Sequence, residues 1–446
     1  MPKITHVIKR SGAIVPFNPD RITNAIYRAA VSEGGRDQAR AAWLAGEVVK
    51  LLEHTIPEGM HPHIEQIQDA VEKVLIENGH AQVAKAYILY REERARERRG
   101  KDKTKQRPSE NVPWEKTWKI LNWAISENVH TIEALNERIR GGEFPLVVKA
   151  SEEAYEREVD SAAELIFNRA DKIRMVIISG PSSSGKTTTT TKLEKRLGGE
   201  DLEFVPINVD NYFFNLEMHP KDEFGDFDFE TPQALDLKLI NQHLQKLVAG
   251  EEIRAPFYDF KTGKRVKEHT PMRLEENQIL LIDSLHGLFP AMTEGISDEL
   301  KVKLFLEPLL QMKGPDERYI RWTDIRLIRR MLRDATHRAY QPRQTLEHWH
   351  YVRSSEMRNI IPYLGAADII INSAMPYELP LYRPKLLDDF AQWKVDYKDD
   401  PLRQDALARA VRVHAFLDAV EPIESDADVP SDSVLREFIG GSSIEY

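Results

Sequence analysis

Residues 180–187 constrain the fold more than any other stretch, because they read Gly, four residues, Gly, Lys, Thr. This pattern requires a strand before it and a helix after it. An apolar run at 175–178 predicts the buried strand, and residues 186–197 predict the helix. Small residues let main-chain N–H groups close around phosphate oxygens at a helix N-terminus. The sequence therefore predicts a phosphate-binding loop.

Two side chains of this loop carry specific expectations. Lys186 is expected to reach the β- and γ-phosphates of ATP, and the Thr187 hydroxyl to ligate Mg²⁺. The predicted nucleotide-binding residues are Gly180, Ser182, Ser183, Ser184, Gly185, Lys186, Thr187, Thr188 and Arg333. An Asn-Lys-x-Asp segment, with which GTPases read guanine, is absent from the sequence.

Further apolar runs predict the sheet around this loop. They lie at 204–209, 279–282, 302–306 and 369–371, and helical stretches near 234–249 and 324–338 separate several of them. Strands that alternate with helices indicate a doubly wound parallel sheet. The predicted fold class is α/β, with a P-loop NTPase-type parallel sheet flanked by helices.

Carboxylates follow two of these strands, at the sheet edge where ligands bind in open α/β folds. Asp210 follows the run at 204–209 and could orient or deprotonate an acceptor hydroxyl. Asp283 ends the run at 279–282 and could hold Mg²⁺ through water. An ordinary aspartate at a strand end is the alternative for both.

The predicted helix at 324–338 is rich in arginine. A solvated helix normally mixes in more acidic residues, so this composition favours a lid that clamps the charge developing in phosphoryl transfer. A plain surface helix is the alternative. The arginines are Arg326, Arg329, Arg330, Arg333 and Arg338. The predicted catalytic residues are Asp210, Lys186, Arg326 and Arg330.

Five ordered stretches together resemble the uridine kinase family, within the group that includes phosphoribulokinase and pantothenate kinase. They are residues 180–187, 210–213, 229–236, 256–260 and 326–338, and residues 367–371 are similar to the family's last strand. The resemblance implies that Asp210 is the base for a nucleoside 5′-hydroxyl. It also implies that Glu230 holds the ribose hydroxyls and that Tyr258 lines the base pocket. The substrate-binding candidates are Tyr212, Glu230, Tyr258, Arg265 and Arg338.

Two departures from that family stand out. Gly263 occupies the place where uridine kinases usually carry the histidine that reads the pyrimidine. The family's Glu-Gly after the third strand is Asp283-Ser284 here. These differences indicate a divergent branch of the family, for which the sequence does not define uridine as the acceptor.

The first 95 residues resemble the ATP-cone, a regulatory nucleotide-binding module, in stretches at 7–12, 15–18, 21–22 and 83–91. Alternating residues at 3–18 predict a β-hairpin, and helices are expected near 37–54, 63–78 and 80–98. The resemblance implies that Lys9 and Arg10 contact the phosphates of an effector, ATP or dATP, with Gly12 in the turn. A degenerate cone kept for packing or self-association is the alternative.

The chain is expected to divide into a cone (1–95), a charged linker and helical bridge (96–170), a phosphotransfer domain (171–385) and a C-terminal extension (386–446). Trp114, Trp118 and Trp123 of the bridge are expected in the core. Leu435, Phe438 and Ile439 of the extension are expected to dock on the body as a short helix.

Composition excludes several classes of protein. Lys plus Arg is 62 against 72 for Asp plus Glu, and the net charge of −10 argues against a general nucleic-acid binder. The absence of cysteine excludes disulfides, thiolate zinc sites and cysteine nucleophiles. Since no apolar window has the length of a membrane helix, a cytoplasmic protein without membrane or nucleic-acid partners is expected, assembled as a homo-oligomer.

The sequence and both resemblances together predict ATP- and Mg²⁺-dependent phosphoryl transfer to a hydroxyl of a small molecule. A nucleoside 5′-hydroxyl is the favoured acceptor, with control by ATP or dATP at the cone. Two alternatives stay open. One is a kinase of a non-nucleoside sugar, polyol or phosphorylated acid. The other is a non-catalytic nucleotide sensor that regulates a partner.

Overall fold

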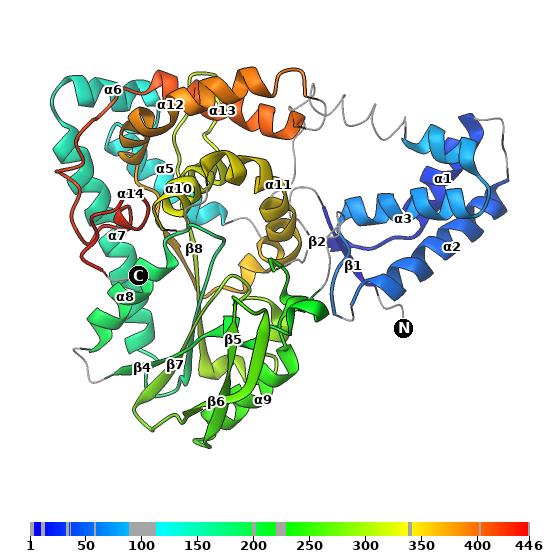
Figure 1. Cartoon of the computed structure of the whole chain (residues 1–446), viewed down its shortest axis with the longest axis horizontal. Coiled ribbons are helices and arrows are strands. Elements are labelled where there is room, and N and C mark those ends of the chain that lie inside the picture. The colour runs from blue at the N-terminus through cyan, green and yellow to red at the C-terminus, as the bar shows by residue number, and fades with distance from the viewer. Residues whose placement is uncertain are drawn as a thin grey trace. The chain divides into compact units, whose positions relative to one another are not determined.

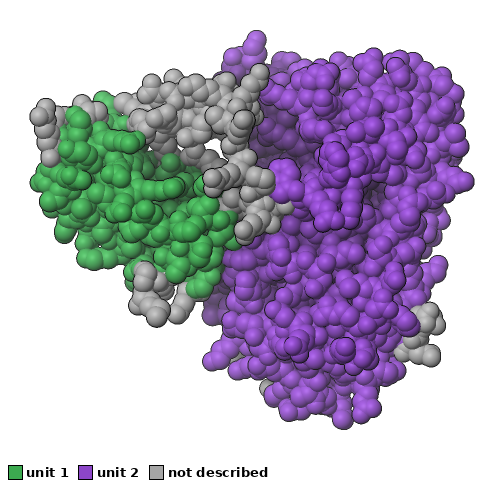
Figure 2. Space-filling model, turned by 180° about the vertical axis from the view of Figure 1, so that it is seen from behind, with its two compact units in different colours: residues 1–112 green, residues 113–446 purple. Residues whose placement is uncertain are grey.

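The computed structural model describes residues 4–9, 14–32, 35, 37–57, 59–88, 113–198, 202–219, 229–337, 341–400 and 403–444. The chain forms two compact units, residues 1–112 and 113–446, which Figure 2 shows in different colours. No helix among the described residues is long and apolar enough to cross a membrane.

Unit 1 consists of a small hairpin and a group of helices. Strand β1 (His6–Ile8) pairs antiparallel with β2 (Ile14–Pro16). The helices are α1 (Asp20–Ser32), α2 (Gln38–Thr55) and α3 (Ile64–Glu77), and residues 81–88 are also helical. Ile26, Val48 and Leu75 are at most 1% exposed and lie in one core shared by the helices. The predicted hairpin and the helices expected near 37–54 and 63–78 are confirmed, and the helix expected over 80–98 is confirmed as far as residue 88, because residues 89–98 lie outside the described residues.

Unit 2 contains the predicted five-stranded parallel sheet, with strand order β4-β7-β3-β8-β9. The strands are β3 (Met175–Ser179), β4 (Glu203–Ile207), β7 (Gln278–Ser284), β8 (Lys301–Glu307) and β9 (Ile369–Asn372). Every residue of the central strand β3 is buried, as its continuous apolar run predicts. Each of the five strands coincides with one of the predicted apolar runs.

Helices surround this sheet (Figure 1). Helix α8 contacts β3, β4 and β7, whereas α7 contacts both α8 and the edge strand β9. The helices are α5 (Trp114–Ser126), α6 (Ile132–Arg140), α7 (Phe144–Phe167), α8 (Lys186–Leu197), α9 (Leu237–Val248), α10 (Trp322–His337), α11 (Pro342–Asn359), α12 (Glu378–Asp396), α13 (Gln404–Ala419) and α14 (Arg436–Ile439). Short 3₁₀ helices are η2 (Val209–Tyr212), η3 (Leu216–Met218), η4 (Pro232–Ala234), η5 (Pro290–Met292), η6 (Asp298–Leu300) and η7 (Ile361–Ala366).

The helices before the sheet share its core. Val159 and Ile166 of α7 are fully buried in the same apolar cluster as Val176 of β3. Trp123 of α5 packs against this cluster. Trp114 and Trp118 are 55% and 62% exposed, so the expectation that they are core residues is wrong. The reason is that α5 buries its face around Ile120 and Ala124 and leaves the opposite face open.

A second antiparallel hairpin, not predicted from the sequence, projects from unit 2. It joins β5 (Ile253–Asp259) to β6 (Lys264–Met272), with Tyr258 opposite Arg265. Figure 1 shows this hairpin and α9 at one end of unit 2, with α12 and α13 at the opposite end. The hairpin thereby places residues 256–260 close to the end of β4, because β5 contacts η2.

Residues 433–439, near the C-terminus, pack into the core of unit 2. Val434 and Leu435 are 0% exposed and Phe438 is 1% exposed. The short helix α14 contacts α10, and Ile439 packs against the main core. The predicted docking of this segment is confirmed.

Candidate active site

The phosphate loop leaves the carboxyl end of β3 and enters α8. Gly185 precedes the helix with φ +91°, and a Cβ there would lie 2.4 Å from Val434 Cγ2, so only glycine fits. Lys186 Nζ donates hydrogen bonds to the carbonyl oxygens of Gly180 (3.0 Å) and Pro181 (3.4 Å). The lysine therefore lies folded over its own loop, at the place where a polyphosphate would bind.

Hydroxyl groups of the loop fit a bound nucleotide. The Ser183 and Ser184 hydroxyls are buried and have no hydrogen-bond partner among the described residues. Buried polar groups are normally satisfied, so these two hydroxyls suit a site whose ligand supplies acceptors. Thr187 is exposed in the first turn of α8, which suits a hydroxyl ligand of Mg²⁺ beside the phosphates.

A carboxylate and a histidine at the end of β7 face Lys186. Asp283 pairs in register with Ile178 of β3, and its residue as a whole is exposed. Protein atoms around the carboxylate reduce its hydration and so raise its pKa, and the positive charge of Lys186 opposes this shift. His286 is 4% exposed, and burial lowers its pKa to about 4, with Lys186 acting in the same direction and the Glu230 main chain opposing.

Sequence reasoning missed His286. Its only signal was its position three residues after Asp283, beyond the carboxyl end of a buried strand. The structure thus brings Lys186, Asp283 and His286 together at one edge of the sheet.

Asp210 stands at the same edge. It lies in η2, directly after β4, and its side chain is exposed. The turn is fixed by Asn208, whose Oδ1 accepts a hydrogen bond from the Asp210 main-chain N–H at 3.0 Å. Ile207 pairs in register with Ile282, so the ends of β4 and β7 lie side by side. Asp210 and Asp283 therefore project from neighbouring strand ends.

An aromatic cluster lies beside the Asp210 turn. The Phe213 and Tyr258 ring centroids are 5.6 Å apart. The cluster comprises Phe213, His219, Phe229, Tyr258 and Phe260. Tyr258 is 2% exposed, and its hydroxyl has no hydrogen-bond partner among the described residues, whereas Phe260 is 62% exposed. The Tyr258 main-chain N–H donates to Asn211 Oδ1 at 3.1 Å, which ties the cluster to the Asp210 turn.

Two residues that were predicted to bind the substrate contact other protein groups instead. Tyr212 is 1% exposed, and its hydroxyl lies 2.9 Å from His243 Nδ1 on α9. Arg265 donates to Asp236 Oδ2 (3.0 Å) and to the Tyr212 carbonyl oxygen (3.2 Å). Both side chains hold η2 against α9 and its N-cap. This corrects the prediction that Tyr212 and Arg265 contact the substrate.

The arginine-rich helix α10 is a core helix. Arg326 is 0% exposed, between Glu307 (2.8 Å) and a bidentate Glu356 (2.5 and 2.9 Å). Arg329 is also 0% exposed and is held by Glu378 at 2.7 and 3.1 Å. Side chains with fixed buried partners cannot belong to an exposed lid, so that prediction is wrong for these two arginines.

The electrostatics of this buried group follow from its charges. Burial raises the pKa of Glu307, which Arg326 opposes. Burial also acts on Glu356, but Arg326 and Arg353 outweigh it and hold the pKa of Glu356 below its ordinary value. Arg326 therefore stays positively charged, and Glu356 stays negatively charged.

Arg330 and Arg333 differ from these two because they are partly exposed. Arg330 Nη1 lies 3.4 Å from Glu230 Oε1, and their side chains are 22% and 29% exposed. Arg333 is 17% exposed and bonds to the neighbouring Asp334. These three side chains, Arg330, Arg333 and Glu230, stay candidates for direct ligand contact.

Three predicted residues, Arg10, Gly12 and Arg338, lie outside the described residues. Lys9 follows β1 in unit 1 and is exposed.

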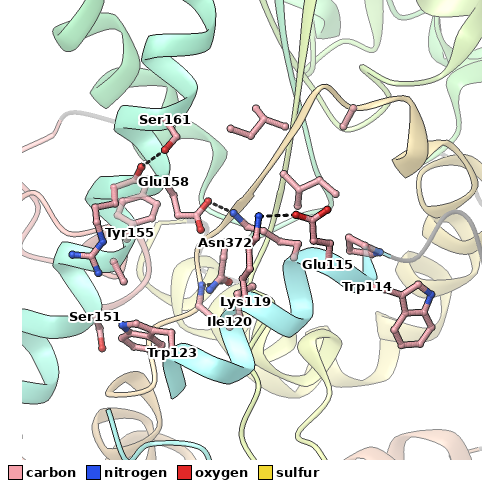
Figure 3. Close-up of a pocket in the computed structure, with 18 of the residues that line it drawn as sticks. Trp114, Glu115, Lys119, Ile120, Trp123, Ser151, Tyr155, Glu158, Ser161 and Asn372 are labelled. Carbon is pink, nitrogen blue, oxygen red and sulfur yellow. Dashed lines mark hydrogen bonds and ion pairs between the residues drawn. The ribbon is translucent and has the colours of Figure 1, made fainter. Parts of the chain in front are cut away.

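A cavity of about 700 Å³ lies apart from the phosphate loop. Figure 3 shows it between α5 and α7, next to Asn372 at the end of β9. Two ion pairs line it, Lys119 with Glu115 at 2.7 Å and Lys116 with Glu158. None of its lining residues belongs to the loop at 180–187. The cavity is therefore not the predicted nucleotide site.

Comparison with known families covers both units. The family described as ATP cone domain matches residues 5–96, and the Phosphoribulokinase / Uridine kinase family matches residues 175–379. Residues 175–379 are a kinase domain of this second family. The match begins at the first residue of β3 and includes the phosphate loop, Asp210, Asp283 and α10. The chain is an ATP-dependent kinase that carries an ATP-cone, and the alternative of a non-catalytic sensor is set aside.

Curated relatives match the kinase domain. The uridine kinase of Bacillus pumilus (strain SAFR-032) is 29% identical over 195 residues, 44% of this chain and 83% of the relative. The uridine kinase of Borrelia duttonii (strain Ly) is 29% identical over 211 residues, 47% of this chain and 91% of the relative. Among solved structures, D-glycerate 3-kinase from Cryptococcus neoformans var. grubii is 13% identical with a TM-score of 0.28, covering 60% of this chain and 90% of that one. That structural likeness is too remote to support an inference.

Proposed function

We propose that the kinase domain transfers the γ-phosphoryl group of MgATP to the 5′-hydroxyl of a nucleoside. Lys186 would hold the β- and γ-phosphates, and Thr187 and Asp283 would hold Mg²⁺, directly or through water. Mg²⁺ would offset charge on the phosphates. Asp210 would accept or orient the acceptor hydroxyl proton. Glu230, beside Arg330, would accept hydrogen bonds from two sugar hydroxyls, for which a carboxylate has enough acceptor sites.

The observation that carries this proposal is the hydrogen bond from the Tyr258 N–H to Asn211 Oδ1. It fixes the aromatic cluster next to the exposed carboxylate of Asp210. The exposed rings of this cluster, Phe260 (62%) and Phe229 (39%), can meet a planar aromatic guest through stacked or edge-on contact. A nucleoside carries such a ring and a primary hydroxyl, so it suits both features at once.

A panel of acceptors tests the proposal. ADP release from MgATP is measured with nucleosides, with sugars and polyols, and with phosphorylated acids. Turnover with a nucleoside is expected, and its 5′-deoxy analogue, which lacks the reacting hydroxyl, is expected to give none. Turnover only with compounds that lack a base would exclude a nucleoside acceptor while leaving the kinase assignment intact.

One observation favours the second candidate, a kinase of a non-nucleoside sugar, polyol or phosphorylated acid. Gly263 lies at the hairpin turn with φ +66°, and a Cβ there would lie 2.8 Å from Leu216 Cβ. The Leu216 N–H also donates to the Gly263 carbonyl oxygen at 2.8 Å. A histidine cannot replace this glycine without strain. A pyrimidine, if it binds, must therefore be recognised by other residues.

The ATP-cone supports a proposal of its own, that ATP or dATP bound to unit 1 changes kinase activity or assembly. The exposed Lys9 and its neighbour Arg10 would contact the effector phosphates. The Lys9→Ala/Arg10→Ala double variant is expected to lose the response to dATP while keeping basal turnover. An unchanged dATP response would remove these residues from the effector site.

A further inference from the structure

The C-terminal segment, residues 433–439, lies directly on the phosphate loop. Val434 fills the space in front of Gly185, where no side chain could fit. On α10, Arg329 lies over the Phe438 ring, 5.0 Å from its centroid. Because Val434, Leu435 and Phe438 are at most 1% exposed, the segment is a fixed wall of the site and not a detachable strap.

This wall carries one buried carboxylate to the beginning of α8. Glu437 is 7% exposed, and its Oε2 accepts a hydrogen bond from the Thr188 hydroxyl at 3.2 Å, across 249 positions of sequence. Helix α8 has no acidic residue of its own in its first turn. Negative charge stabilises a helix N-terminus. Glu437, although distant in sequence, therefore supplies an acidic side chain to the first turn of α8.

Three of the side chains around Glu437, Lys186, Thr188 and Arg333, are among those predicted to bind nucleotide phosphates. Lys186 and Thr188 face it from α8, and Arg329 and Arg333 face it from α10. Burial raises the pKa of Glu437, and the positive charges of Arg333, Lys186 and Arg329 oppose that shift. A carboxyl group of the chain itself thus lies among side chains that are predicted to bind phosphate.

We propose that Glu437 is an affinity-setting residue of the nucleotide site, whose carboxylate competes with the nucleotide polyphosphate for Lys186, Thr188 and Arg333. This inference rests on the proposed binding of ATP at the phosphate loop. Since the segment is fixed, a nucleotide must move or protonate the Glu437 side chain and leave the backbone in place. The carboxylate therefore weakens ATP binding, and it disfavours ligands in proportion to their negative charge.

Binding to the 446-residue chain, measured by titration calorimetry, tests this inference. Glu437→Gln removes the charge and keeps the shape, so its Kd for MgATP and for inorganic tripolyphosphate should fall about tenfold, the ratio that corresponds to ~1.4 kcal/mol. Its Kd for adenosine, which has no phosphate, should not change. Glu424→Gln, an exposed glutamate of the same C-terminal extension, is the matched control and should leave all three unchanged.

The outcomes separate this inference from the function it rests on. If Lys186→Ala binds MgATP as tightly as the wild type, the proposed nucleotide site itself fails. If Lys186→Ala loses binding but Glu437→Gln leaves tripolyphosphate affinity unchanged or weaker, the competition is overturned. Weaker adenosine binding by Glu437→Gln would also overturn it, because it would show that Glu437 contributes to binding of the nucleoside part of ATP. Should Glu437→Gln not fold, Glu437→Asp gives a second test, because it keeps the charge and withdraws the carboxylate from Thr188 by one methylene, so tripolyphosphate should again bind more tightly than to the wild type.

Discussion

Arg326 on α10 donates a hydrogen bond from Nη1 to the main-chain carbonyl oxygen of Ser182 in the phosphate loop, at 3.2 Å. The same guanidinium is clamped by Glu307 and Glu356 inside the core. The loop that is expected to hold phosphate is thus anchored to a buried ion-pair group. We therefore expect Arg326 to influence phosphoryl transfer through the position of the loop, as a positioning residue.

This anchoring predicts different outcomes for two neighbouring arginines. Arg326→Gln leaves the buried Glu307 without its ion-pair partner and Glu356 with Arg353 alone, so the free energy of unfolding should fall by about 3–5 kcal/mol. Arg330→Gln breaks a partly exposed pair with Glu230 and should cost ~1 kcal/mol or less. Urea unfolding of both variants measures the difference. Equal losses would show that Arg326 is not a structural anchor.

Lys186 is the next test, because its folded position over Gly180 and Pro181 is expected to open toward a polyphosphate. Lys186→Ala should abolish ATP turnover and leave thermal stability close to that of the wild type, since its side chain is only partly buried. Lys195→Ala, on the same helix, is a control for the loss of a lysine. Phosphoryl transfer at the wild-type rate by Lys186→Ala would refute the loop assignment.

His286 predicts a pH dependence of stability. Burial lowers its pKa to about 4 from the ordinary 6.5. Between those values the unfolded chain binds a proton that the folded chain does not, so the free energy of unfolding falls as pH falls from 6.5 toward 4. The full effect is about 3 kcal/mol, at ~1.4 kcal/mol per pKa unit.

Urea unfolding at pH 7 and pH 4.5 measures this effect as a difference between variants. His286→Asn should lose less stability than the wild type over this interval, and His269→Asn, an exposed histidine of β6, should behave like the wild type. Parallel losses in all three proteins would mean that His286 is not buried in its neutral form.

The sheet and the phosphate loop could be predicted from the sequence, but which arginines of α10 are buried could not. Buried parallel strands are continuous apolar runs, and the Gly185 and Lys186 pattern marks the loop, so both can be read locally. Arg326 and Arg330 lie on one short stretch of α10 and look equivalent in sequence. Only the packing of Glu307 and Glu356, brought from β8 and α11, decides which one is buried.

Tyr212 and Glu437 show the same limit. Tyr212 follows Asp210 by two residues, but its hydroxyl turns to His243 on α9, which no local pattern reveals. Glu437 reaches Thr188 from the opposite end of the chain. Contacts between such distant segments depend on the whole fold, whereas strand and loop signals depend on neighbouring residues.

The central claim is that Asp210 faces an acceptor hydroxyl beside the nucleotide. Single-turnover transfer from γ-labelled ATP to the acceptor found in the panel tests it most directly, with ATP affinity measured on the same samples. Asp210→Asn should slow transfer by roughly 10²–10⁴-fold, the usual contribution of a general base, at unchanged ATP affinity. Transfer by Asp210→Asn at close to the wild-type rate would contradict the account.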